Sequence, residues 1–179
     1  MNKFYVFAVL LGFLLSSCSS RLTPFTQRMY DDFTWTQEDL KRIQFYVSKD
    51  IRLWRDISTT DESYIEEGKV RLVNGRNVEE VVIKKGTPGV LLFAPKENRF
   101  AIGFDDKEDN FLMFGPNKRS NGKYKLLAKE WGRSTGKITY NGQTYNVSSD
   151  DAYAGLMIDI KSARKRSYNS TRPDGRKVR

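Results

Sequence analysis

The sequence predicts an α+β domain in which a small antiparallel β barrel or a strongly bent antiparallel sheet carries one or two short flanking helices. Short apolar or alternating segments follow one another between residues 68 and 147, each bounded by turn residues. Two Asn-Gly pairs, at 74–75 and 141–142, supply the positive φ that tight hairpins need. Apolar residues recur at helical spacing only near the two ends of this region. Many short strands with tight turns are typical of small barrels and bent sheets.

The first eighteen residues have the pattern of an export signal. Lys3 precedes an unbroken apolar stretch over residues 4–15, which is too short to span about 30 Å of hydrocarbon as a helix. The stretch ends in Leu15-Ser16-Ser17-Cys18, which resembles the bacterial lipobox. That resemblance implies that residues 1–17 are a lipoprotein signal peptide and that Cys18 carries diacylglycerol and a further acyl chain such as palmitate. A cleaved soluble export signal is the alternative.

The same resemblance implies a cellular location. Ser19 follows the cysteine, whereas an aspartate at this place is the usual retention signal of inner-membrane lipoproteins. We therefore expect a lipid-anchored protein of the bacterial outer membrane. The periplasmic face is favoured over the cell surface, because residues 19–23 contain no acid.

Three segments are expected after the signal: an acylated cysteine and tether over residues 18–35, a single β-rich domain over 36–160 and a basic disordered tail over 161–179. Mixed polarity and an early proline at position 24 suggest the tether. The domain begins where Thr36 is followed by an acid three residues later, a variant of the capping box. Apolar residues then recur at helical spacing and predict a helix over 36–45.

Strands account for most of the remaining domain. Alternation over residues 51–57 predicts the first strand. Further strands are expected at residues 68–73, 78–83, 90–94, 99–104, 111–114, 124–129, 137–140 and 144–147. Residues 152–160 fit a closing helix, which we favour, although alternation over 156–160 also suits a final strand.

Positive charge is concentrated at the C-terminus. The chain carries 31 Lys and Arg against 22 Asp and Glu, but residues 161–179 alone hold eight of the basic residues and one acid. This segment has no apolar periodicity, so we expect it to be disordered or to fold only on a partner. Arg164, Lys165 and Arg166 are candidates for contact with a protein or an anionic envelope polymer or lipid, a merely solubilising tail being the alternative. No nucleic-acid partner is expected of an exported chain.

The residue inventory excludes most catalytic chemistries. The chain has no histidine, and Cys18 is its only cysteine. The mature domain therefore lacks the usual general base of Ser-His-acid hydrolases, a thiol nucleophile and the common zinc ligands. We expect no catalytic residue, no cofactor and no resident metal.

Two further clusters are candidate sites. Residues 105–110 form an acidic loop whose oxygens are the kind that Ca²⁺ prefers, but the spacing matches no EF-hand and a solvated hairpin tip is the default. Trp131 and Arg133 lie near a turn and are candidate partner-binding residues. Together with Tyr140 and Tyr145 they would form an exposed aromatic platform, unless these aromatic rings pack in the core.

Two classes of function follow. The first, which we favour, is a membrane-anchored lipoprotein that acts without catalysis as a binding or assembly component of the cell envelope. The alternative is a hydrolase that acts on cell-wall glycan with carboxylates alone, which needs two Asp or Glu side chains facing one cleft.

Overall fold

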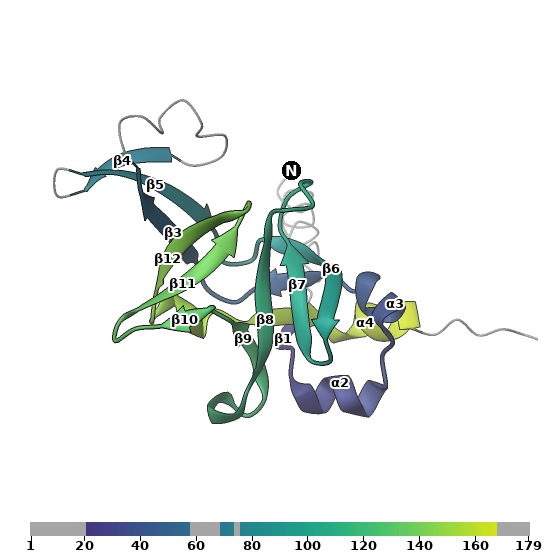
Figure 1. Ribbon diagram of the computed structural model, residues 1–179. Coiled ribbons are helices and arrows are strands. Elements are labelled where there is room, and N and C mark those ends of the chain that lie inside the picture. The colour runs from purple at the N-terminus through teal and green to yellow at the C-terminus, as the bar shows by residue number, and fades with distance from the viewer. Residues whose placement is uncertain (1–20, 58–68, 74–75, 168–179) are drawn as a thin grey trace, which may run out of the picture.

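The computed structural model describes residues 21–57, 69–73 and 76–167 (Figure 1). The strands form two antiparallel sheets, so the prediction of a mostly β, antiparallel domain is confirmed. Within the described residues, no helix combines the length and the apolar character needed to cross a membrane.

The larger sheet has seven strands in the order β1-β13-β2-β6-β7-β8-β9. Its strands are β1 (Leu22–Pro24), β2 (Phe45–Val47), β6 (Pro88–Lys96), β7 (Arg99–Gly103), β8 (Phe111–Asn117), β9 (Lys123–Leu126) and β13 (Leu156–Asp159). The register between β6 and β7 shifts twice, and such bulges increase the local twist and bend of a sheet.

The smaller sheet has six strands in the order β10-β11-β12-β3-β5-β4. Its strands are β3 (Ile51–Asp56), β4 (Lys69–Val73), β5 (Arg76–Ile83), β10 (Glu130–Trp131), β11 (Thr135–Tyr140) and β12 (Gln143–Ser148). The predicted hairpin at Asn141-Gly142 is confirmed, with φ of 48° and 66° at the two residues. The Asn-Gly pair at 74–75 lies outside the described residues.

The seven-stranded sheet curls until its two edges meet. Tyr124 of β9 donates its backbone N–H to the carbonyl of Phe25, just after β1, at 3.0 Å. Leu126 of β9 donates to Ala154, just before β13, at 3.1 Å. These contacts are isolated bridges rather than a continuous ladder, so the described strands form a strongly bent sheet and not a closed barrel.

The interior of this bent sheet is aromatic. Phe25 packs edge-on against Tyr124 with ring centroids 4.8 Å apart, and Phe100 stacks on Tyr124 at the same separation. Phe45 meets Phe25 at 5.4 Å. Each of these rings is fully buried, and edge-on or offset pairs of this kind add to the free energy gained by burial.

The residues that the structure describes also form three helices and two 3-10 turns: α2 (Gln27–Phe33), α3 (Gln37–Lys41), α4 (Ile160–Ser167), η3 (Lys118–Ser120) and η4 (Asp151–Tyr153). The capping box predicted at Thr36 is present, because Thr36 and Asp39 each accept from the other's backbone N–H. The helix is shorter than predicted. It ends at Lys41 because Phe45 enters β2, where it pairs with Ile158 and Gly89.

Residues 22–35 belong to the folded body, which corrects the predicted tether over 18–35. Leu22 begins β1, and Thr26 caps α2 by accepting from the N–H of Met29. Phe25 and Trp35 are buried in the core. Burying two large aromatic side chains outweighs the polar character of the residues around them.

The predicted closing helix over 152–160 is wrong, and the alternative of a final strand is right. Residues 156–159 form β13, which lies between β1 and β2 and pairs with both. Helix α4 follows within the segment 161–179 that was expected to be disordered, and its Ala163 is buried against the core. Residues 168–179 lie outside the described part of the chain.

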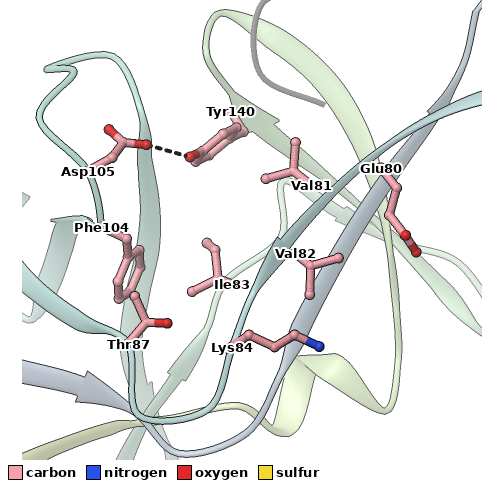
Figure 2. Close-up of a pocket in the computed structure, with 9 residues that line it drawn as sticks. All are labelled: Glu80, Val81, Val82, Ile83, Lys84, Thr87, Phe104, Asp105 and Tyr140. Carbon is pink, nitrogen blue, oxygen red and sulfur yellow. Dashed lines mark hydrogen bonds between the residues drawn. The ribbon is translucent and has the colours of Figure 1, made fainter. Parts of the chain in front are cut away.

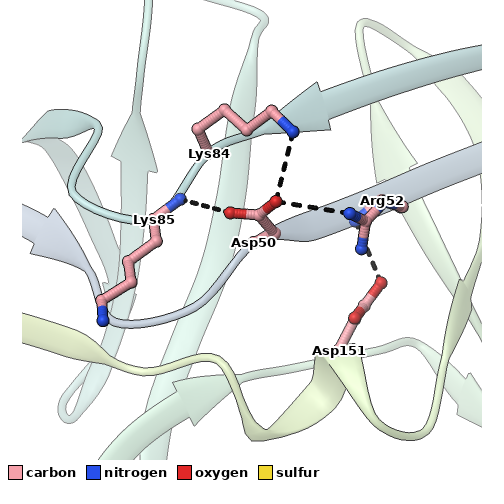
Figure 3. Close-up of polar contacts among 5 residues, drawn as sticks. All are labelled: Asp50, Arg52, Lys84, Lys85 and Asp151. Carbon is pink, nitrogen blue, oxygen red and sulfur yellow. Dashed lines mark hydrogen bonds and ion pairs between the residues drawn. The ribbon is translucent and has the colours of Figure 1, made fainter.

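The chain crosses between the sheets four times, and carboxylates join three of the crossings (Figure 3). Asp50, between β2 and β3, accepts from the backbone N–H of Lys85 at 2.8 Å and from the Lys84 ammonium at 3.2 Å, both between β5 and β6. It also accepts from the Arg52 guanidinium at 3.3 Å. Asp151, between β12 and β13, accepts from the backbone N–H of Arg52 at 3.1 Å. These contacts hold the two sheets together where the chain passes from one to the other.

Candidate binding cleft between the two sheets

A cleft of about 750 Å³ lies where β5 of the smaller sheet faces the end of β7 in the larger sheet (Figure 2). This volume is in the range of small-molecule and side-chain binding sites. Its walls are made by Glu80, Val81, Val82, Ile83, Lys84, Thr87, Phe104, Asp105 and Tyr140.

Apolar side chains from both sheets form the inner wall. Val81 and Ile83 share one face of β5, because side chains alternate along a strand. Phe104 approaches from the opposite side, where its ring meets the buried Phe114 edge-on at 6.2 Å. Figure 2 shows Ile83 and Phe104 on opposite sides of the cleft. An apolar ligand group would be covered from two directions here.

Tyr140 and Asp105 form the polar end of the cleft. The Tyr140 hydroxyl donates to the Asp105 carboxylate at 3.0 Å, drawn as the dashed line in Figure 2. Asp105 also accepts from the Asn110 side-chain amide at 3.0 Å and from the backbone N–H of Lys107 at 3.0 Å. The bond from Tyr140 ties the acidic loop to β11, and the other two bonds are internal to the loop.

The Asp105 carboxylate of the acidic loop is directed to protein donors. The described part of the chain contains no group of three or more acidic side chains able to hold a metal ion.

A buried ion pair lies on the same face of the smaller sheet as Val81. Glu79 is 3% exposed and accepts from the Arg55 guanidinium at 2.5 Å and from the Tyr145 hydroxyl at 3.0 Å. The Tyr145 ring meets the Tyr140 ring edge-on at 6.2 Å. The two packed tyrosine rings therefore lie between the polar end of the cleft and the buried carboxylate with its arginine.

The pKa values in this cluster follow from burial and charge. Burial, reinforced by the hydrogen bond and negative charge of Glu79, raises the pKa of Tyr145 to about 12. Burial lowers the pKa of Arg55, but the hydrogen bond and charge of Glu79 outweigh it and leave that pKa above its ordinary value. Tyr145 therefore remains a neutral donor at physiological pH, and Arg55 remains charged.

Charged groups line the outer rim of the cleft. Glu80 and Lys84 stand on the rim from β5 and the turn after it, and Thr87 follows on the way into β6. The Lys84 ammonium is mostly exposed and also contacts Asp50. Both signs of charge therefore occur among the residues that line the cleft.

Of the candidate residues from the sequence, Asp105 and Tyr140 line this cleft, whereas Trp131 and Arg133 do not. Trp131 is 45% exposed and its ring lies over Gly136, where an added Cβ would come within 2.7 Å of it. Arg133 is exposed nearby. Tyr140 and Tyr145 are buried, so the expectation that these aromatic rings pack in the core is right, and they form no exposed platform with Trp131.

The basic candidates lie on α4, on the opposite side of the fold from the smaller sheet (Figure 1). Arg164 and Lys165 are exposed, and the Arg164 guanidinium sits 5.0 Å above the ring of Phe33. Arg166 is within the helix. The lipobox and Cys18 lie outside the described residues.

The residues that form the apolar wall of the cleft have no distinctive signal in the sequence. Val81, Ile83 and Phe104 lie in segments predicted only as strands, and Tyr140 fits either an exposed platform or the core. Apolar and aromatic residues in or beside strands are also what a core requires, so this pattern does not distinguish a cleft from a core.

Comparison with protein-family models, with curated proteins and with solved structures gives no match for this chain.

Proposed function

We propose that the protein is a lipid-anchored binding component of the bacterial cell envelope, held at the periplasmic face of the outer membrane and without catalytic activity. The observation that carries the proposal is the segment Leu15-Ser16-Ser17-Cys18 directly after an apolar stretch. Several acyl chains on one cysteine make a stable anchor, because each buried methylene contributes about 0.8 kcal/mol.

The inter-sheet cleft is the part of the body that best suits a partner. It combines an apolar wall of Val81, Ile83 and Phe104 with a hydroxyl and a carboxylate at one end. We also propose that the bent seven-stranded sheet, its edges bridged at Tyr124 and Leu126, behaves as a small, incompletely closed barrel that keeps one wall of the cleft rigid.

The alternative, a carboxylate-dependent hydrolase of cell-wall glycan, is favoured by one observation. Two carboxylates, Asp105 and Glu80, are among the residues that line the cleft. Because Glu80 alternates with Val81 and Ile83 along β5, however, its side chain points to the other face of the strand (Figure 2). Against it, Asp105 is engaged by three donors. Glu79, the buried acid nearby in the sequence, is engaged by Arg55 and Tyr145.

The anchor is tested by growing cells with a clickable palmitate analogue and by mass spectrometry of the purified protein. We expect label on the wild-type chain and none on the Cys18→Ser variant, which should move from the outer-membrane fraction to the soluble fraction. A wild-type chain without acyl mass, or with residues 1–17 still attached, would refute the proposal.

The cleft is tested by blocking it. Thr87→Trp places a large ring at its wall, whereas Thr139→Trp places the same ring on an exposed position of β11. A photo-crosslinking amino acid at position 104 should capture an envelope partner in the background of Thr139→Trp and lose it with Thr87→Trp. If purified protein instead releases soluble fragments from cell-wall sacculi, and Asp105→Asn abolishes the release, the hydrolase alternative is correct.

A further inference from the structure

The proposed anchor is close to the folded body. Only three residues separate Cys18 from Leu22, the first residue of β1. Four Cα-to-Cα steps of extended chain span at most roughly 14 Å. A body attached this closely would lie against the lipid headgroups and could not stand away from them.

The pairing of β1 with β13 places the start of α4 next to Leu22. Leu22 pairs with Asp159, the last residue of β13, and α4 begins at the next residue, Ile160. Asp159 then caps α4 by accepting from the backbone N–H groups of Lys161 and Ser162 at 3.0 and 3.4 Å. The point where the chain enters the body and the start of α4 are therefore adjacent.

The exposed surface of α4 is basic. Lys161, Arg164 and Lys165 are exposed, whereas Ala163 is buried and holds the helix to the body. Helix α4 contains no acidic residue, and the chain beyond it holds four further Lys or Arg against one Asp. Asp159, the acid closest in sequence, directs its carboxylate to the helix cap and to the Ser162 hydroxyl at 2.9 Å.

We propose that the exposed face of α4, formed by Lys161, Arg164 and Lys165, is a second membrane contact that binds anionic lipid headgroups beside the acylated Cys18. This inference rests on the proposed function, because it needs the anchor at residue 18. A basic segment next to a lipid anchor is attracted to anionic lipid, and each Lys or Arg near the surface adds to that attraction.

Two contacts fix how the body stands on the membrane, whereas a single anchor point would leave its orientation free. Helix α4 lies on the opposite side of the fold from the smaller sheet (Figure 1). With α4 on the headgroups, the smaller sheet and the β5 wall of the cleft face away from the lipid. The cleft is then presented to a partner in the periplasm.

The test measures which side of the acylated protein faces the lipid. Because the only native cysteine carries the anchor, Ser162→Cys introduces the single free thiol of the chain and accepts one fluorophore. Thr144→Cys, exposed on β12 of the smaller sheet, is the matched control. Each acylated full-length mature protein is incorporated into vesicles that contain a headgroup spin label, made either of phosphatidylglycerol with phosphatidylethanolamine or of phosphatidylcholine alone.

In anionic vesicles we expect quenching at position 162 to exceed quenching at 144 by about twofold or more, with the difference reduced in phosphatidylcholine and at high salt. Lys161→Gln with Lys165→Gln should reduce quenching at 162 by about half, since each removed charge weakens attraction to the anionic surface. Lys129→Gln with Lys137→Gln, which removes two charges next to or on the smaller sheet, should leave it unchanged.

Equal quenching at positions 162 and 144, or quenching at 162 that does not depend on lipid charge, would overturn the inference while leaving the anchor intact. One of these outcomes is expected if the basic face of α4 binds an acidic cell-wall polymer and not the lipid. A purified chain without acyl mass, which does not enter vesicles at all, would overturn the proposed function and this inference with it.

Discussion

The most consequential single residue in the described structure is Glu79, a carboxylate that is almost completely buried. It is stable there because Arg55 and Tyr145 both donate to it. A buried charge costs several kcal/mol to desolvate, so its partners are needed to keep the fold intact whether or not the pair adds net stability.

Replacing Arg55 with methionine should therefore lower the free energy of unfolding by about 3 kcal/mol, because an unpaired carboxylate remains buried. Urea denaturation measures this loss. Arg52→Met is the control, since the Arg52 side chain is half exposed and its pair with Asp50 is solvated, so the midpoint should move little. Equal effects of the two substitutions would show that Glu79 does not depend on Arg55.

The raised pKa of Tyr145 predicts that the folded protein loses stability at high pH. Its pKa is about 12 in the folded protein against 10.0 for the free side chain. The unfolded chain gives up this proton first, so the contribution of Tyr145 is complete below pH 10 and is lost as the pH rises toward 12. The fall in the free energy of unfolding across this window should be shallower in Tyr145→Phe, whereas an unchanged slope would assign it to other groups.

At the scale of elements, the strands with their own turns were predictable. Asn141-Gly142 fixes its hairpin locally, because both residues adopt positive φ, and the alternation over residues 51–57 matches β3. Elements that depend on distant partners were not. Residues 156–159 fit either a helix or a strand, and become β13 because β1 and β2 are available on both sides.

The same reason explains the missed N-terminal elements and the missed cleft. Phe25 and Trp35 stand among polar residues with no periodicity, and only the assembled sheet provides the core that buries them. Tyr140 and Asp105 are 35 residues apart in the sequence, and nothing local indicates that they meet.

Asp50 links two of the segments in which the chain passes from one sheet to the other, so its removal should loosen these segments locally. In Asp50→Ala, hydrogen exchange of the Lys85 amide, which donates to Asp50, should accelerate by roughly tenfold because a charge-assisted hydrogen bond is lost. The pKa of Asp50 lies below its ordinary 3.8. The largest cause is the hydrogen bond from the Lys85 backbone N–H, and the second is the hydrogen bond from the Lys84 side chain. The same loss of protection, measured relative to the intrinsic exchange rate at each pH, should therefore appear in the wild-type protein only at a pH below the ordinary carboxyl pKa. Unaltered exchange at Lys85 in the variant would contradict the assignment.

At the scale of the whole molecule, the two sheets share one hydrophobic core. The cluster includes Phe25 and Phe100 from the larger sheet's side and Leu53 and Val147 from the smaller sheet, all fully or almost fully buried. With four crossings between the sheets, neither can unfold without exposing residues of the other.

Both sheets should therefore unfold in a single transition. A Trp54→Phe, Trp131→Phe chain retains only the buried Trp35 near the larger sheet, and a Trp35→Phe, Trp131→Phe chain retains only Trp54 on β3. In each chain, urea curves followed by tryptophan fluorescence and by far-ultraviolet circular dichroism should coincide. Two separated transitions in either chain would show that the sheets are independent.

The three-residue strand β1 also determines how the molecule responds to mechanical force. Tension applied at the N-terminal end enters through Leu22, and β1 is joined to β13 by three residue pairs, one of which involves Pro24 and so lacks an N–H donor. In an optical-tweezers pull from residue 19, β1 should detach first, as a short extension at low load, while longer strands such as β6 and β8 stay paired. Under load, the protein would then lose this terminal strand before the rest of the fold unfolded.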